Sequence, residues 1–107
     1  MSEHIQKILR ELKAGLRQIY GEQLDSVILY GSYARGDAHP PDSDIDVMIV
    51  LRDYQSYGKE IDRTGELVSE LSLQHGISIS RVIMKRIQWQ NSDTPLLRNI
   101  RAEGLAA

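Results

Sequence analysis

The chain has 107 residues, of which 41% are hydrophobic and 26% charged, with a formal net charge of -2 and no cysteine. This balance excludes a strongly basic protein that coats nucleic acid, a disulfide framework and a thiolate zinc site. No apolar run approaches the ~20 residues of a membrane helix, and the charged N-terminal stretch is unlike a secretory signal peptide. We therefore expect one cytoplasmic domain, residues 1–107, that contacts neither membranes nor nucleic acid directly.

The apolar pattern predicts three helices and three strands. Ser2 is positioned to cap the first helix and Gly21 to end it, while Pro95 lies near the first turn of the last helix. A loop rich in turn-forming residues, 36–42, separates the first two strands. In chain order the elements are a helix over 5–19, strands over 26–30 and 44–51, a helix over 61–75, a strand over 77–84 and a helix over 93–103. This order predicts a small α/β (α+β) domain with a mixed three-stranded sheet flanked by helices.

Two aspartates, Asp44 and Asp46, begin the second predicted strand. Side chains two residues apart on a strand point to the same face, so we expect the two carboxylates to lie side by side. Unpaired carboxylates repel each other, and a divalent cation would relieve that repulsion. Hard oxygen ligands of this kind suit Mg²⁺ together with substrate phosphates. Asp44 and Asp46 are therefore predicted to be metal ligands and catalytic residues.

A Gly-Ser corner, Gly31-Ser32, follows the first predicted strand. Glycine lets the backbone turn sharply and approach a ligand closely, and a short helix through Arg35 would present N–H groups to a phosphate. The Ser32 hydroxyl and the Arg35 guanidinium could add further phosphate contacts. A Gly-Ser pair or an Asp-x-Asp pair alone is usually a turn or a solvated strand end. Their joint occurrence, each attached to its own buried strand, predicts a triphosphate site at Gly31, Ser32 and Arg35, beside a metal site.

The resemblance to a known family rests on two motifs, GSYARG at 31–36 and SDIDV at 43–47. Together they resemble the signature of the DNA polymerase beta-like nucleotidyltransferase superfamily, and more narrowly of its minimal nucleotidyltransferases (MNT). The tail RAEG, 101–104, is similar to the ending of MNT proteins. The resemblance implies a polymerase beta-like core and Mg²⁺-dependent transfer of AMP from ATP to a hydroxyl. It also implies a partner, because many MNT proteins are antitoxins that adenylylate a tyrosine of a HEPN-domain toxin. We therefore expect a hetero-oligomer with such a toxin.

One departure from the family pattern concerns the third predicted strand. Active members usually carry a third carboxylate there, whereas this chain has Ser78 and Ser80 on the corresponding face. General-base help is worth typically ~10²–10⁴-fold in rate, so its loss favours slow modification of a stoichiometric partner. Two alternatives stay open: an antitoxin that occludes the toxin with little or no catalysis, and a nucleotidyltransferase acting on a small molecule or an RNA end.

Residues outside the motifs are interpreted as scaffold. The three histidines show no metal-ligand spacing. Trp89 is interpreted as a cover for the end of the core rather than an interface anchor, and Arg101 as charge on a helix surface.

Overall fold

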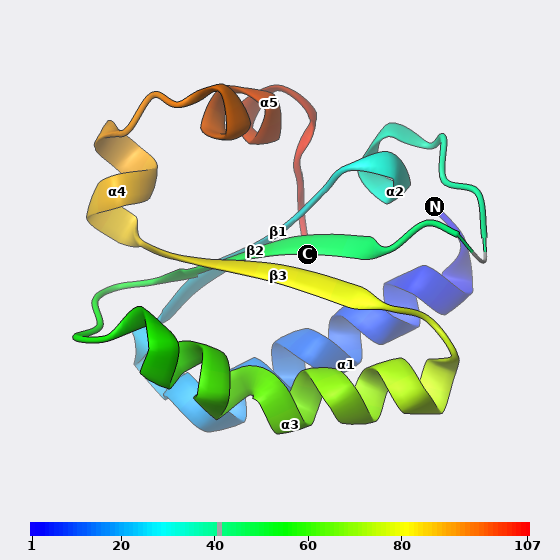
Figure 1. The fold of residues 1–107 in the computed structure, drawn as a ribbon, viewed down its shortest axis with the longest axis horizontal. Helices are drawn as coiled ribbons and strands as arrows, with labels where there is room; N and C mark the ends of the chain where they lie inside the picture. Colours follow the sequence, from blue (N-terminus) through cyan, green and yellow to red (C-terminus); the bar gives the residue numbers. More distant parts are fainter. Residues whose placement is uncertain (41) are drawn as a thin grey trace.

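The computed structural model describes residues 1–40 and 42–107. They form a four-stranded sheet between two layers of helices (Figure 1). In chain order the elements are α1 (Glu3–Tyr20), the 3-10 helix η1 (Gly21–Gln23), β1 (Leu24–Tyr30), α2 (Ser32–Arg35), β2 (Ile45–Leu51), α3 (Tyr57–His75), β3 (Ile79–Lys85), α4 (Arg86–Asn91), α5 (Pro95–Glu103) and β4 (Leu105–Ala106). The predicted α/β class, with a mixed sheet flanked by helices, is confirmed.

Three short elements, η1, α4 and β4, were not predicted from the sequence. The sheet has four strands rather than three, because β4 pairs with the free edge of β1. Two residues are too few to show an alternating pattern, so only the tertiary pairing defines this strand. Helix α4 also escaped prediction, since its sequence RIQWQN has little apolar periodicity. In the predicted loop 36–42, Pro41 lies outside the described residues.

The sheet order is β3-β2-β1-β4, with β2 at its centre. β2 runs parallel to β3 and antiparallel to β1. The end of β1 therefore lies beside the starts of β2 and β3. In this register Asp46 lies opposite Tyr30 of β1 and opposite Ser80 of β3. The topology thus brings the Gly-Ser corner and the aspartate pair to the same end of the sheet.

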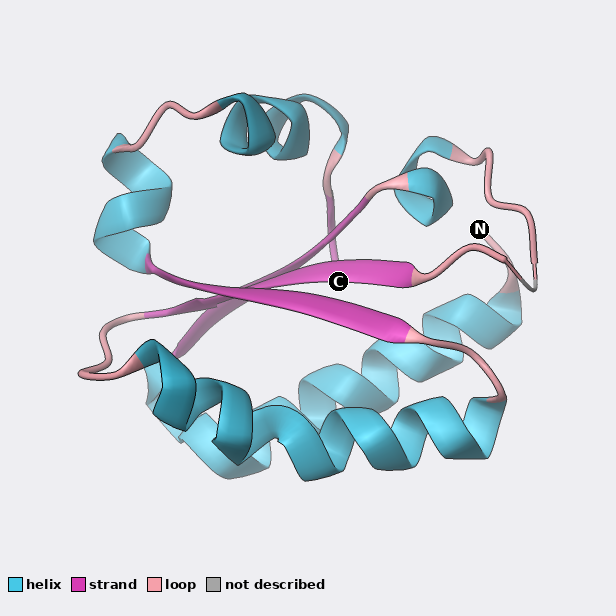
Figure 2. Ribbon diagram, viewed as in Figure 1, coloured by secondary structure: helices cyan, strands magenta, loops and turns pink. Residues whose placement is uncertain are grey.

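Helices cover both faces of the sheet (Figure 2). The larger apolar cluster joins α1 and α3 to one face, and the smaller cluster joins Leu97 and Ile100 of α5 to Met48 and Val50 on the other. All residues of β2 are buried except Asp46, which is partly exposed. A strand covered on both faces is expected to be almost continuously apolar, so Asp46 interrupts an otherwise apolar strand on the α5 face.

Side-chain caps define where the helices begin. The Ile5 amide donates to Ser2 Oγ at 3.2 Å, and the Leu97 amide donates to Thr94 Oγ1 at 3.2 Å, one residue before Pro95. These contacts confirm Ser2 as the first cap and Pro95 in the first turn of the last helix. Helix α3 starts at Tyr57, ahead of its apolar pattern, because Ser56 caps it. Across residues 1–40 and 42–107, the helices are all too short or too polar to cross a membrane.

Candidate active site

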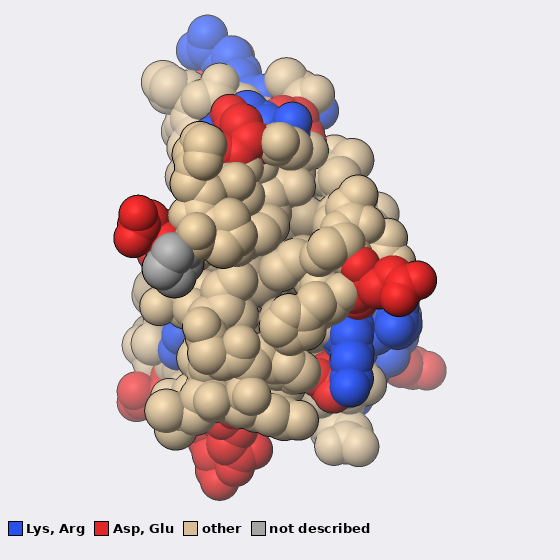
Figure 3. Space-filling model, turned by 90° about the vertical axis from the view of Figure 1, so that its right-hand side faces the viewer, with Lys and Arg blue, Asp and Glu red and all other residues tan. Residues whose placement is uncertain are grey.

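Three strands meet at one end of the sheet and bring both motifs together. Cross-strand partners share a face, so Tyr30, Asp46 and Ser80 lie side by side on the face that α5 covers. Gly31 and α2 follow directly from Tyr30. Figure 3 shows the end of the molecule that carries α2: acidic and basic side chains lie mainly toward the edge of a surface whose centre is largely uncharged.

The backbone at Gly31 requires glycine for two reasons. Its φ of 76° and ψ of -156° lie in a region that is essentially restricted to glycine. In addition, a Cβ built at this position would overlap Oδ2 of Asp46 and lie 3.2 Å from Asp46 Cγ. The corner therefore packs its backbone directly against the Asp46 carboxylate.

The short helix α2 presents free N–H groups next to this contact. Its first backbone bonds are donated by Ala34 and Arg35 to the Gly31 carbonyl oxygen, at 3.1 and 3.0 Å. The N–H groups of Ser32 and Tyr33 therefore precede the first bonded turn and can donate to a ligand. The predicted helix from Ser32 to Arg35 is therefore present, and N–H groups of this kind can bind phosphate.

The aspartate pair lies on one face, as the sequence predicts. Asp44 is exposed and Asp46 partly exposed, while Ile45 between them is fully buried on the opposite face. Burial raises the pKa of Asp46, the Asp44 charge raises it further, and Arg35 lowers it. Within the described part of the chain, neither aspartate forms an ion pair. The pair therefore carries negative charge that no direct ion pair offsets.

This charge distribution fits a divalent cation. The residues described include no group of three or more His, Cys, Asp or Glu that could hold a metal ion alone. Mg²⁺ is commonly bound by one or two carboxylates plus substrate phosphates rather than by an all-protein cage. Asp44 and Asp46, next to the free N–H groups at the start of α2, could hold Mg²⁺ in this way.

Glu103, to which we assigned no role from the sequence, joins this site. Glu103 Oε1 accepts from the Gly31 amide at 3.4 Å and from Arg35 Nη1 at 3.2 Å. Arg35 Nε also pairs with Asp37 Oδ2 at 3.2 Å. The hydrogen bond to Asp37 raises the pKa of Arg35 most, and the one to Glu103 raises it further. Glu103 thus ties the end of α5 to the corner. The tail motif RAEG was the only sequence signal for it.

The strand expected to carry a third carboxylate offers serines. Ser80 lies opposite Asp46, and its hydroxyl donates to Asp44 Oδ2 at 3.5 Å. Ser78 precedes β3, and its carbonyl oxygen accepts from the Ile45 amide at 2.9 Å. Ser80 therefore lies beside the aspartates, on the strand where the family resemblance led us to expect a third carboxylate.

Trp89 and Arg101 form a structural contact, which agrees with their interpretation as scaffold. The Arg101 guanidinium lies 4.7 Å from the centre of the Trp89 ring and donates to the carbonyl oxygens of Trp89 and Ser92. Trp89 itself packs, partly buried, against the smaller apolar cluster. These contacts connect α4 to α5.

Residues 9–105 match the family model described as "Nucleotidyltransferase domain". The chain belongs to this family. Two proteins of Methanocaldococcus jannaschii, both described as candidate protein adenylyltransferases, are similar to it. One is 39% identical over 80 residues, covering 75% of this chain and 79% of the relative. The other is 30% identical over 105 residues, covering 92% and 93%.

Solved structures share the fold of this nucleotidyltransferase. A chain of a toxin–antitoxin complex with AMP-PNP matches with a TM-score of 0.60 and 20% identity, covering 89% of this chain and 68% of that chain. A chain of the complex between a tri-AMPylated Shewanella oneidensis HEPN toxin and its MNT antitoxin matches with a TM-score of 0.57 and 18% identity, covering 94% and 69%. The family match and the two relatives confirm the predicted nucleotidyltransferase family, and these structures confirm its fold.

Proposed function

We propose that this nucleotidyltransferase transfers AMP from ATP to a tyrosine hydroxyl of a HEPN-type toxin and thereby acts as its antitoxin. The main support is the contact of Gly31 with Asp46, which sets a phosphate-binding turn against a carboxylate pair. The names of the two Methanocaldococcus jannaschii relatives support protein adenylylation. The solved toxin–antitoxin complexes, one with an AMPylated toxin, support a HEPN partner.

In this proposal each motif residue has a defined task. Asp44 and Asp46 hold Mg²⁺, which when bound neutralises charge on the triphosphate and on the leaving pyrophosphate. The N–H groups at the start of α2 and the Ser32 hydroxyl bind phosphate oxygens. Arg35 exchanges one of its two carboxylate partners for a phosphate oxygen. Its fork-shaped guanidinium can donate to phosphate in the same geometry as to a carboxylate.

The reaction forms a bond between the acceptor oxygen and the α-phosphorus of ATP. The bond from this phosphorus to the bridging oxygen of the β-phosphate breaks, and pyrophosphate leaves with that electron pair. The hydroxyl proton passes to water or to a base on the partner, because Ser80 stands beside the aspartates in place of an acid. Without general-base help we expect transfer to be slower by ~10²–10⁴-fold, a rate compatible with modifying a stoichiometric partner.

The test is the intact mass of a HEPN-domain partner after co-expression with this chain. The proposal predicts a mass gain of one or more adenylates with the wild-type chain and none with the double variant Asp44→Asn/Asp46→Asn. The double variant Asp62→Asn/Glu70→Gln removes the same charge from exposed positions of α3 and should leave the mass gain unchanged. An unchanged gain with the Asp44/Asp46 variant would refute the site assignment.

A second candidate function is an antitoxin that neutralises its partner by occlusion alone. The observation that favours it is Ser80 at the position of the expected acid. Occlusion predicts that toxin neutralisation survives the substitutions Asp44→Asn/Asp46→Asn and that the partner co-purifies at its unmodified mass. Loss of neutralisation in that variant, with an intact complex, would exclude occlusion as sufficient.

A further inference from the structure

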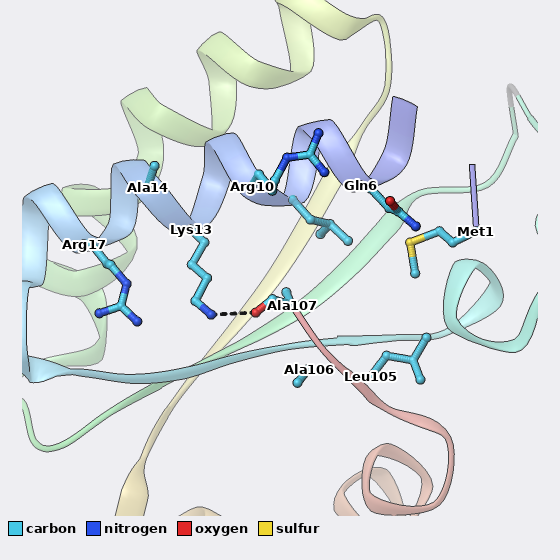
Figure 4. A pocket seen from close by; sticks show the side chains of 10 residues that line it. Met1, Gln6, Arg10, Lys13, Ala14, Arg17, Leu105, Ala106 and Ala107 are labelled. Carbon is cyan, nitrogen blue, oxygen red and sulfur yellow. Dashed lines mark hydrogen bonds between the residues drawn. The ribbon is translucent and has the colours of Figure 1, made fainter. Parts of the chain in front are cut away.

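A groove of about 750 Å³ lies between α1 and the edge strand β4 (Figure 4). One wall is formed by side chains of α1 and the other by the C-terminal strand. The aspartate pair and the Gly-Ser corner do not line it. The side chains used below are Arg10, Lys13 and Arg17 of α1 and Leu105, Ala106 and Ala107 of the strand.

The α1 wall of the groove is basic, and no acidic side chain among the described lining residues compensates its charge. Arg10, Lys13 and Arg17 are three or four residues apart, so they form one row along the helix, where like charges repel. The lining residues include no acidic side chain, and none of the three forms an ion pair within the described residues. Lys13 Nζ donates to the Ala107 carbonyl oxygen at 2.8 Å. In a chain of net charge -2, this local row points to an anionic ligand.

The opposite wall offers an open strand edge. The Ala107 amide donates to the Val27 carbonyl oxygen at 2.9 Å, and antiparallel pairs alternate in the direction of their hydrogen bonds. The N–H and C=O groups of Ala106 therefore face away from β1, toward the open edge. Leu105 beside it is 44% exposed. An edge of this kind pairs with an added extended segment, whose backbone satisfies these groups.

These observations favour a peptide over RNA or a second copy of this chain. The groove lining contains no aromatic side chain on which a base could stack, and an open strand edge matches a peptide backbone. A second copy related by twofold symmetry would bring its own basic row to the same place. We propose that the groove binds an acidic, extended segment of a partner protein by strand addition to β4.

The groove also leads toward the candidate active site. Met1 lines both this groove and a neighbouring hollow. The hollow is also lined by Tyr33 of α2 and by Gly36, which follows α2. A segment bound along β4 would therefore approach the phosphate-binding turn. In the proposed function this segment belongs to the acceptor protein, and only this last link rests on that function.

The test is an NMR titration of the isotopically labelled chain without nucleotide. The probe is a short synthetic peptide that alternates threonine and glutamate, and its control has glutamine in place of each glutamate. We expect salt-sensitive shifts in the amides of α1 and of Ala106 with the acidic peptide alone. Affinity should fall at least about tenfold in Arg10→Gln/Lys13→Gln/Arg17→Gln. The matched variant Lys7→Gln/Arg52→Gln/Lys59→Gln has the same net charge, alters exposed basic residues outside the groove, and should bind normally.

Three results would overturn the proposal. The first is no binding of the acidic peptide, and the second is an equal loss of peptide affinity in both triple variants. The third is binding of an RNA oligonucleotide to the groove in place of the peptide. The variant Asp44→Asn/Asp46→Asn should bind the peptide normally, because neither residue lines the groove. Failure of AMP transfer and failure of peptide binding are therefore separate outcomes.

Discussion

Replacing Gly31 by alanine tests how tightly the corner and the aspartate pair are coupled. The backbone conformation at this position costs a non-glycine residue about 1–3 kcal/mol. The new methyl group also overlaps Oδ2 of Asp46, so this partly exposed side chain must rotate away, at a cost of about 0.5–1.5 kcal/mol. We therefore expect Gly31→Ala to lower the free energy of unfolding by about 1.5–4.5 kcal/mol. In a chain of this size, that corresponds to a fall in Tm of roughly 6 °C or more.

The matched control is Gly36→Ala at the other end of α2. Gly36 also has a positive φ, 83°, but a Cβ there meets no atom within 4 Å. Gly36→Ala should therefore lower the free energy of unfolding only by the strain of the left-handed backbone, about 1–2 kcal/mol. Free energies of unfolding come from urea denaturation followed by circular dichroism.

A double-mutant cycle separates the two contributions at Gly31. In the Asp46→Ala background the overlapping carboxylate is gone, so Gly31→Ala should cost about 0.5–1.5 kcal/mol less than in the wild type. The reasoning is refuted if Gly31→Ala costs no more than Gly36→Ala and the cycle shows no coupling between Gly31 and Asp46.

Three further predictions concern stability. Because the pKa of Asp46 is raised in the fold, the folded state keeps its proton to higher pH than the unfolded chain, and stability falls as pH rises through this titration. Asp46→Asn should therefore be more stable than the wild type at neutral pH, and the gap in Tm should close toward acidic pH; a wild type that is the more stable of the two at neutral pH would contradict this. Tyr20→Phe removes a 3.0 Å hydrogen bond to buried Glu60 and should cost about 1.5–3 kcal/mol in urea denaturation. Tyr57→Phe, at a side chain that is 46% exposed, should be nearly neutral, and equal costs would disprove the role of the bond. Leu97→Ala, at a side chain that is 2% exposed in the smaller cluster, should cost about 2–5 kcal/mol, and a change below 1 kcal/mol would show that α5 does not stabilise the sheet.

The parts of the fold that local sequence patterns determine could be predicted. The apolar run of β2 indicates a strand buried on both faces, and Asp44 and Asp46 share a face because side chains alternate along a strand. The Gly31 corner followed by a helical turn was likewise predictable, because a positive φ and close packing both select glycine.

Contacts between distant parts of the chain could not be predicted. Glu103 meets Gly31 and Arg35 across separations of 72 and 68 residues, and no local pattern specifies such a pair. His75 Nδ1 lies 3.2 Å from His4 Nε2, and His75 Nε2 lies 2.7 Å from Glu11 Oε2. The spacing of the histidines in the sequence suggested no such cluster. These contacts depend on how whole elements pack.

The most direct test of the proposed function is label transfer from ATP to the HEPN-domain partner. Two parallel reactions use ATP labelled in the α-phosphate or in the γ-phosphate, with Mg²⁺ and either the wild-type chain or Asp44→Asn/Asp46→Asn. The proposal predicts that the partner acquires the α-label only, and only with the wild-type chain. Acquisition of the γ-label, or of the α-label with the double variant, would contradict nucleotidyl transfer at Asp44 and Asp46.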